Sequence, residues 1–317
     1  MEKAILKTLI YADIFDYPLQ INEIHRWLIG KKATLRQVEE ALGKLVQSAK
    51  CKVQSGYYFL PRKNGLVIQR RHRERQSAVY LRKVKFLSQI LRVIPWIKLV
   101  GISGGLALGN ASKKDDIDLF IVTSKNRLWI SRLLTLGLLS LIGQRRKVGE
   151  RGRKIAGKLC INILLGEDRL EQANKDIFVA HELLQMKVLW QRDGVYAKYL
   201  EDNSWAFKFL PNWVSIGVAR LGSDDFGRQP RSLARERKRP AANRLGYARF
   251  ARLGFAAFGG SLTLFVEILA RKFQLKIMQK PKGRERIEDG ALYFHPHDIR
   301  QQVLSKYEQK LKKIISS

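Results

Sequence analysis

Cysteines, acidic residues and long uninterrupted apolar runs are all scarce in this chain of 317 residues. Its two cysteines, Cys51 and Cys160, lie in apolar, strand-like surroundings and show no metal-binding spacing. We therefore expect a reduced, intracellular protein of the cytoplasm. The first residues carry acids within an apolar run and lack a small-residue cleavage site, so we do not expect a signal peptide.

Two apolar runs are candidates for a membrane-spanning segment. Residues 133–143 are too short to cross a bilayer. Residues 253–270 are long enough, but Gly259 and Gly260 interrupt them and Glu267 lies among them. We therefore expect two buried helices. The alternative is that the Arg and Lys residues beside these runs attach the protein to an anionic membrane surface.

The shortage of acidic residues leaves a large positive charge. The chain has 60 Lys and Arg residues against 28 Asp and Glu residues, a formal net charge of +32. Such a balance indicates a polyanionic partner, either nucleic acid or an anionic membrane, although a general preference for Lys and Arg would give the same composition. A hydrophobic fraction of 45% fits a folded protein, and the length allows two or three domains.

The N-terminal region has the pattern of a winged helix-turn-helix. Apolar spacing predicts helices over residues 2–11 and 21–29, and a third that begins after Thr34 with Gln37 in a capping-box position. Two short strands around Gly56 complete the pattern. The exposed side of the third helix carries two glutamates, which would repel phosphates, so binding of nucleic acid and a protein-contact role both stay open. The basic residues 62–92 are expected to form mostly one long helix.

The segment "LVGISGGLALGNASKKDDIDLFIVT", residues 99–123, places two carboxylates in an apolar strand. Asp116 and Asp118 are two residues apart, so a strand directs both to one face. Two neighbouring buried anions are tolerable when they share divalent cations, and Mg²⁺ prefers carboxylate and phosphate oxygens. The turn at Gly104 and Gly105 lets backbone amides approach a triphosphate. The segment therefore predicts a site for a nucleotide and its metal.

These residues also carry a family resemblance. Gly104-Gly105, the run from Ala107 to Ala111 and the sequence Asp116-Ile117-Asp118-Leu119 resemble the signature of the DNA polymerase β-like nucleotidyltransferase superfamily. Residues 181–212, together with the N-terminal region, are similar to uncharacterised bacterial proteins that pair a winged helix with this domain. The resemblance implies an α+β fold in which a mixed β-sheet has flanking helices. It also implies Mg²⁺ (or Mn²⁺) ions and transfer of a nucleoside monophosphate from a nucleoside triphosphate with release of pyrophosphate.

The resemblance also implies roles for individual residues. Asp116 and Asp118 would be catalytic and would hold the metal, while the nucleotide-binding residues would be Ser103, Gly104, Gly105 and Asn110. The family has a third carboxylate on a later strand. In the strand 158–165 the aligned position is Asn162, which can bind a metal through its carbonyl but cannot act as a base. Glu167 and Asp168, just beyond this strand, are the alternative.

We therefore predict three regions: a winged helix-turn-helix (1–75), a nucleotidyltransferase domain (76–205), and a basic linker with a helical C-terminal region (206–317). The expected activity is Mg²⁺-dependent nucleotidyl transfer to an RNA or protein acceptor. The alternative is a nucleic-acid-binding regulator whose degenerate transferase domain senses nucleotide. Association with a membrane surface is a third possibility. Residues 228–244 form the basic linker, and the basic arm 143–158 either contacts a triphosphate or acceptor or is a solvated loop.

Overall fold

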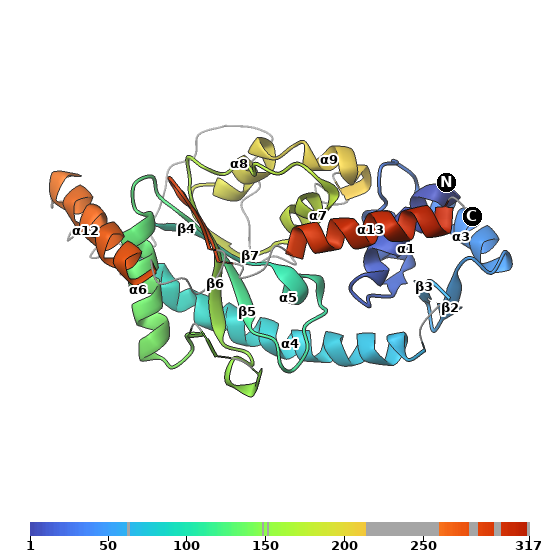
Figure 1. Cartoon of the computed structure of the whole chain (residues 1–317), viewed down its shortest axis with the longest axis horizontal. Coiled ribbons are helices and arrows are strands. Elements are labelled where there is room, and N and C mark those ends of the chain that lie inside the picture. Colours follow the sequence, from blue (N-terminus) through green and yellow to red (C-terminus); the bar gives the residue numbers. More distant parts are fainter. Residues whose placement is uncertain are drawn as a thin grey trace, which may run out of the picture.

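A computed structural model describes residues 1–61, 64–147, 149–150, 152–213, 260–278, 285–294 and 299–315 (Figure 1). These residues form a mixed six-stranded sheet with helices on both faces, and a small three-stranded antiparallel sheet near the N-terminus. This agrees with the predicted mixture of helices and sheet. The predicted basic linker, 228–244, lies outside the described residues.

Residues 1–61 form an N-terminal module of three helices and a small sheet. Helices α1 (Glu2–Asp13), α2 (Ile21–Arg26) and α3 (Leu35–Gln47) precede the hairpin of β2 (Lys52–Gln54) and β3 (Tyr57–Phe59). Strand β1 (Leu19–Gln20) pairs with β3. The predicted capping box is confirmed, because Gln37 N donates to Thr34 Oγ1 over 3.3 Å and Thr34 N donates to Gln37 Oε1 over 3.0 Å. The order of elements is compatible with a winged helix.

A long helix, α4 (Leu66–Ile90), connects this module to the main sheet, as the sequence predicts (Figure 1). Near its start, the buried Arg70 donates to Glu23 over 2.8 Å and to Glu74 over 2.7 Å. Its guanidinium also lies 3.6 Å from the centre of the Tyr17 ring. Arg70 therefore fixes the module to α4, because a buried guanidinium needs these partners.

The main sheet has the strand order β7-β4-β5-β6-β9-β8. Its strands are β4 (Ile97–Ile102), β5 (Ile117–Thr123), β6 (Leu159–Gly166), β7 (Lys187–Gln191), β8 (Arg286–Glu288) and β9 (Ala291–Tyr293). The pair β5 and β6 is parallel, and the other neighbours are antiparallel. Alternation along β5 separates two cores, since Ile117 and Leu119 face one side while Phe120 and Val122 face the other.

Different helices cover the two faces of this sheet. The face of Ile117 packs against α4, the 3₁₀ turn Leu91–Val93 and α6 (Leu128–Leu141). The face of Phe120 packs against α7 (Ile177–Gln185), α8 (Val195–Asp202) and α9 (Ala206–Phe209), and its apolar core continues into the N-terminal module. A short helix, α5 (Gly104–Leu108), follows β4, and a second 3₁₀ turn covers Gly152–Lys154.

The C-terminal region contributes strands as well as the expected helices. Strand β9 pairs with β6, and β8 extends the sheet beyond it. Helix α13 (Ile299–Ile315) then returns to the N-terminal module, where Tyr307 meets Tyr11 edge-on with ring centres 5.6 Å apart. An ion pair of Lys310 with Asp13 joins the same two helices. The two ends of the chain therefore pack together (Figure 1).

Helix α12 (Gly260–Met278) packs beside α6 at the opposite end of the molecule (Figure 1). The sequence predicts that this helix is buried, and the prediction is wrong for most of its apolar side chains, since Phe265 is 56% and Phe273 is 57% exposed. Among the described helices, none has both the length and the hydropathy that a bilayer crossing requires.

Candidate functional site

The glycine turn after β4 lies directly against the carboxylate of Asp118. Gly104 has a φ of +62°, and a β-carbon at this position would lie 3.0 Å from Asp118 Oδ2. Ser103 N donates to the backbone carbonyl of Asp118 over 3.1 Å, which fixes the turn beside β5. A glycine is therefore required at residue 104 for two reasons, the left-handed backbone and the close approach of a charged side chain.

Asp116 immediately precedes β5, Asp118 is its second residue, and the two side chains face the same side, as their spacing predicts. Ligand atoms of Asp116, Asp118 and Cys160 all lie within 4.8 Å of one another, so these three residues can hold a metal ion. Arg146 donates to Asp116 Oδ2 over 2.6 Å. Arg146 belongs to the basic arm 143–158, and its backbone N–H bonds to the Leu159 carbonyl, so part of the arm borders the site.

The single positive charge of Arg146 does not balance the negative charges of the two carboxylates. Burial is the main reason that the pKa of Asp118 rises to about 8, and the neighbouring charges of Asp116 and Glu182 raise it further. Burial also raises the pKa of the Cys160 thiol to about 12. Without an added cation, the Asp118 carboxyl therefore holds a proton near neutral pH. A divalent cation would supply the missing positive charge.

Glu182 of α7 is a member of the site that the sequence analysis missed. The Gly104 backbone N–H donates to its carboxylate, yet burial raises its pKa to about 7. Its charge also acts on Asp118. The available signal was a single acid inside the apolar stretch "IFVAHELLQ", which reads equally well as the solvent-facing residue of a core helix. Its proximity to the glycine turn depends on how α7 packs against the sheet.

The third position beside the carboxylates is occupied by Cys160. In the parallel pairing of β5 with β6, Asp118 is opposite Cys160, so both side chains point to the same face. Leu119 then pairs with Ile161 and Phe120 with Ile163, which leaves Asn162 as the extra residue of a bulge. The Asn162 amide, 2% exposed, donates to Ser103 Oγ over 3.2 Å. Asn162 thus supports the glycine turn, and Cys160 lies closest to the predicted metal ligands.

Glu167 and Asp168 lie at the far end of the strands. Thr123, the last residue of β5, pairs with Gly166, immediately before Glu167. Five residues of strand separate Asp118 from Thr123, a distance of about 17 Å at 3.3–3.4 Å per residue. Glu167 instead accepts a hydrogen bond from Lys125 N over 3.2 Å. These two acids are therefore separated from the paired aspartates.

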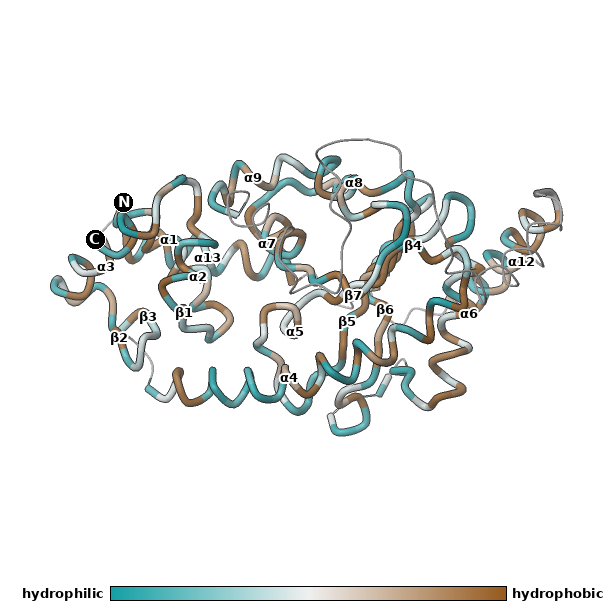
Figure 2. Tube along the Cα trace, turned by 180° about the vertical axis from the view of Figure 1, so that it is seen from behind, coloured by the Kyte–Doolittle hydropathy of each residue, from teal (hydrophilic) through white to brown (hydrophobic). Residues whose placement is uncertain are grey.

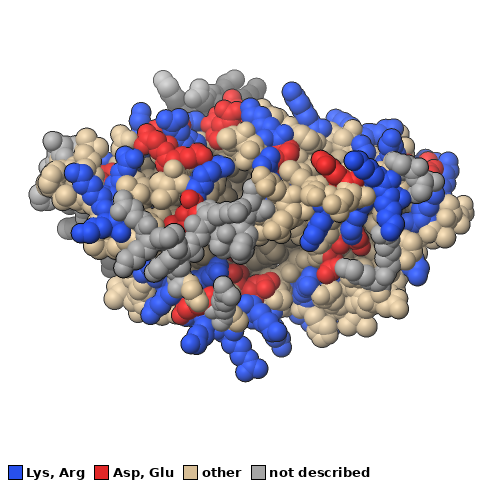
Figure 3. Space-filling view, viewed as in Figure 1, with Lys and Arg blue, Asp and Glu red and all other residues tan. Residues whose placement is uncertain are grey.

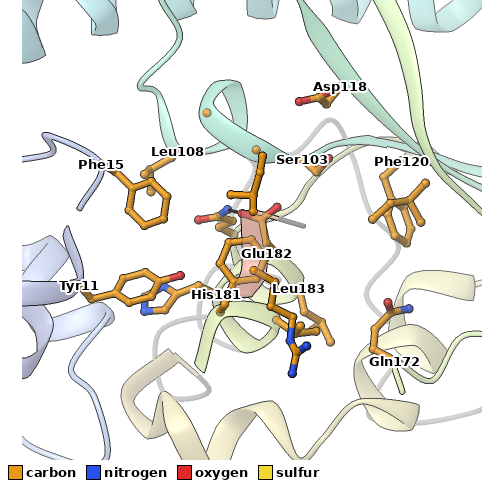
Figure 4. Close-up of a pocket in the computed structure, with 18 of the residues that line it drawn as sticks. Tyr11, Phe15, Ser103, Leu108, Asp118, Phe120, Gln172, His181, Glu182 and Leu183 are labelled. Carbon is orange, nitrogen blue, oxygen red and sulfur yellow. Dashed lines mark hydrogen bonds between the residues drawn. The ribbon is translucent and has the colours of Figure 1, made fainter. Parts of the chain in front are cut away.

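A cavity of about 520 Å³ opens beside the site (Figure 4). Ser103, Gly104, Gly105, Asn110 and Asp118 line it, which brings four predicted nucleotide-binding residues and one predicted metal ligand to a single space. Figure 4 also shows Tyr11 and Phe15 on the side of the N-terminal module, with Glu182 from α7 between them and Phe120. The volume suits a ligand of nucleotide size, and the aromatic walls suit a planar ring.

Asn110 and its neighbour Leu108 connect the site to the N-terminal module. The Asn110 amide donates to the Phe15 carbonyl over 3.1 Å and accepts from Arg73 over 3.2 Å. The Tyr17 hydroxyl donates to the Leu108 carbonyl over 2.8 Å. The module thus forms one wall of the cavity and is bonded to the end of α5 and to Asn110 just beyond it.

Comparison with known proteins finds no matching family model, no matching curated protein and no matching solved structure.

We predict that Gly104→Ala lowers the free energy of unfolding by about 1–3 kcal/mol, because the new β-carbon is strained and meets Asp118. Gly105→Ala is the matched control, since its β-carbon would lie 3.7 Å from the nearest atom, the Asn110 carbonyl oxygen, and its backbone is not left-handed. Urea denaturation measures both variants. Equal stability of the two would contradict the assigned role of Gly104.

We also predict that the metal-free protein loses stability as the pH rises from 5 to 8. The folded chain keeps the Glu182 proton up to about pH 7, whereas the ordinary pKa is 4.5, so this stabilisation is present below pH 4.5 and disappears as the pH passes 7. Urea denaturation at several pH values in the presence of a chelator measures how steeply the free energy of unfolding changes with pH. Glu182→Gln retains an acceptor for the Gly104 N–H and should reduce the slope, by at most about 1.4 kcal/mol per pH unit. An unchanged slope would contradict the raised pKa.

Proposed function

We propose that this protein is a divalent-cation-dependent nucleotidyltransferase that moves a nucleoside monophosphate from a nucleoside triphosphate to an RNA or protein acceptor. The observation that supports this most directly is the pair of carboxylates, Asp116 and Asp118, on one face of β5 and next to the turn of Gly104 and Gly105. The adjoining cavity has the size and the aromatic lining that a nucleotide needs.

The donor set fits a hard divalent cation through its two carboxylates. Mg²⁺ or Mn²⁺ would be held by Asp116 and Asp118, with remaining positions for water and phosphate oxygens. Cys160 is a poor ligand for Mg²⁺, because it is a soft donor whose thiol is neutral at physiological pH. When bound, such cations neutralise phosphate charge and activate the acceptor oxygen.

The chain's own residues would bind and orient the nucleotide. Tyr11 and Phe15 would contact the base, because they form an apolar wall of the cavity. The Glu182 carboxylate already accepts the Gly104 N–H, so a phosphate can use this amide only after Glu182 moves away. Arg146 is paired with Asp116 and would orient that carboxylate, and its guanidinium would also attract phosphate oxygens.

The charge of the surface supports a polyanionic acceptor. Lys and Arg side chains project over much of the face in Figure 3, with Asp and Glu side chains in smaller groups among them. With a formal net charge of +32, the protein would attract RNA or an acidic protein surface, while a cationic small molecule would be repelled.

A second candidate is a nucleotide sensor without turnover, part of a nucleic-acid-binding regulator. The specific observation in its favour is Cys160, which stands where a third carboxylate would complete the metal site. Glu167 and Asp168 lie too far along the strands to replace it. Incubation with each α-labelled nucleoside triphosphate, Mg²⁺ or Mn²⁺, and total cellular RNA and protein separates the candidates, since only the transferase labels an acceptor.

The double variant Asp116→Asn, Asp118→Asn tests the site that both candidates share. We expect it to fold and to lose metal-dependent binding of ATP, because two of the three clustered donors lose their charge. Isothermal titration calorimetry with Mg-ATP measures this. Glu167→Gln combined with Asp168→Asn is the control, as it removes two acids from the far end of β6 and should bind like wild type. If the double aspartate variant binds Mg-ATP normally, the nucleotide site lies elsewhere.

The third position of the metal site, beside Asp116 and Asp118, gives a further prediction. Cys160→Asp places a carboxylate beside Asp118, and we expect it to raise transfer about ten- to a hundredfold, equivalent to about 1–3 kcal/mol. Asn162→Asp should instead destabilise the fold, because it buries a carboxylate and removes the amide that donates to Ser103. Turnover and urea denaturation of both variants measure this. A gain from Asn162→Asp alone would show that residue 162 is the true third ligand position.

A further inference from the structure

Helix α12 directs two polar side chains, those of Glu267 and Gln274, toward the protein. Glu267 and Gln274 are only 7% and 3% exposed. Glu267 accepts hydrogen bonds from Trp129 N over 2.8 Å and from Ile130 N over 2.9 Å, and so caps the beginning of α6. Gln274 donates to the Trp129 carbonyl over 2.7 Å and accepts from Arg132 over 2.6 Å. A hydrogen-bonded seam therefore holds α12 on α6.

The opposite side of α12 is apolar and exposed. Four large side chains follow one another at helical spacing, and we call them the outer face of α12: Leu262, Phe265, Leu269 and Phe273 are 51%, 56%, 48% and 57% exposed. The neighbouring α6 also exposes Leu133, Leu134 and Leu141. Figure 2 shows hydrophobic stretches on both helices at the end of the molecule away from the N-terminal module. A contiguous apolar surface of this kind marks an interaction site.

The charges around this face are positive. Helix α12 carries Arg271, which lies 3.9 Å from Asp289, together with Lys272 and Lys276, and its only acid, Glu267, points inward. Arg127 and Arg132 of the α6 region donate to Thr263 and Gln274 of α12, so they belong to the contact between the two helices. Lys272 and Lys276 are exposed and fall on the outer side of the helix by their spacing. This combination complements an anionic lipid surface, whereas a second copy would bring like charges together.

We propose that the outer face of α12 docks this protein on an anionic phospholipid bilayer, with the helix lying in the membrane interface. Residues such as Phe265 and Phe273 would enter the boundary between headgroups and acyl chains, and the lysines would contact lipid phosphates. A helix in this position need not cross the bilayer, in agreement with the absence of a spanning helix from the described part of the chain. The proposal is independent of the proposed nucleotidyl transfer.

Flotation of the full chain with lipid vesicles tests the proposal. We expect binding to phosphatidylcholine vesicles that contain phosphatidylglycerol, weaker binding to phosphatidylcholine alone, and partial loss at high salt. The double variant Phe265→Gln, Phe273→Gln should bind the anionic vesicles at least about tenfold more weakly than wild type. The substitutions remove apolar contacts without changing the charge. The control is Val79→Gln with Phe86→Gln, which removes two exposed apolar side chains from α4.

The basic residues are tested in the same assay. Lys272→Gln with Lys276→Gln should weaken binding to anionic vesicles more than Lys31→Gln with Lys32→Gln, which removes two exposed charges from the N-terminal module. Failure of wild type to float with anionic vesicles overturns the proposal. Equal binding by the wild type and the Phe265, Phe273 variant also overturns it. If light scattering instead shows a dimer that this variant converts to a monomer, the outer face is a contact between copies.

Discussion

The repulsion between Asp116 and Asp118 is the constraint around which the site is built. Both carboxylates point to the same side of the sheet, and among the described residues only Arg146 forms an ion pair with them, through Asp116. The pKa of Asp118 rises to about 8 as a result of burial and its acidic neighbours. Gly104 has no side chain where Asp118 approaches, and Glu182 adds a further carboxyl group. An arrangement that concentrates acids in this way is stable and useful when a cation is shared between them.

The cavity beside these acids depends on contacts between distant parts of the chain. The N-terminal module supplies its aromatic wall, and the glycine turn with α7 supplies its polar groups. Hydrogen bonds of Tyr17 and Asn110 connect the two walls, while the buried Arg70 and helix α13 hold the module in place. Any movement of the module would therefore change the shape of the cavity.

The amphipathic pattern of helix α12 does not by itself decide which face of the helix packs on the protein. The apolar run 253–270 suggested burial, and the single Glu267 looked like an interruption. In the structure Glu267 and Gln274 pair with α6, and the phenylalanines face outward. The backbone N–H groups at the beginning of α6 require partners, and Glu267 of α12 provides them. The polar seam and the exposed apolar face are thus two consequences of the same packing.

The sequence by itself determined the features that depend on local geometry. A two-residue spacing puts Asp116 and Asp118 on one face of a strand, and Thr34 with Gln37 caps a helix, because both relations involve neighbouring residues. Only the tertiary structure decided that Cys160 and Glu182 join the site. Cys160, and not Asn162, lies beside the aspartates because the register of β5 and β6 pairs Asp118 with Cys160, and the packing of α7 brings Glu182 to the glycine turn. Strand register and helix packing join residues far apart in the chain, so no local pattern encodes them.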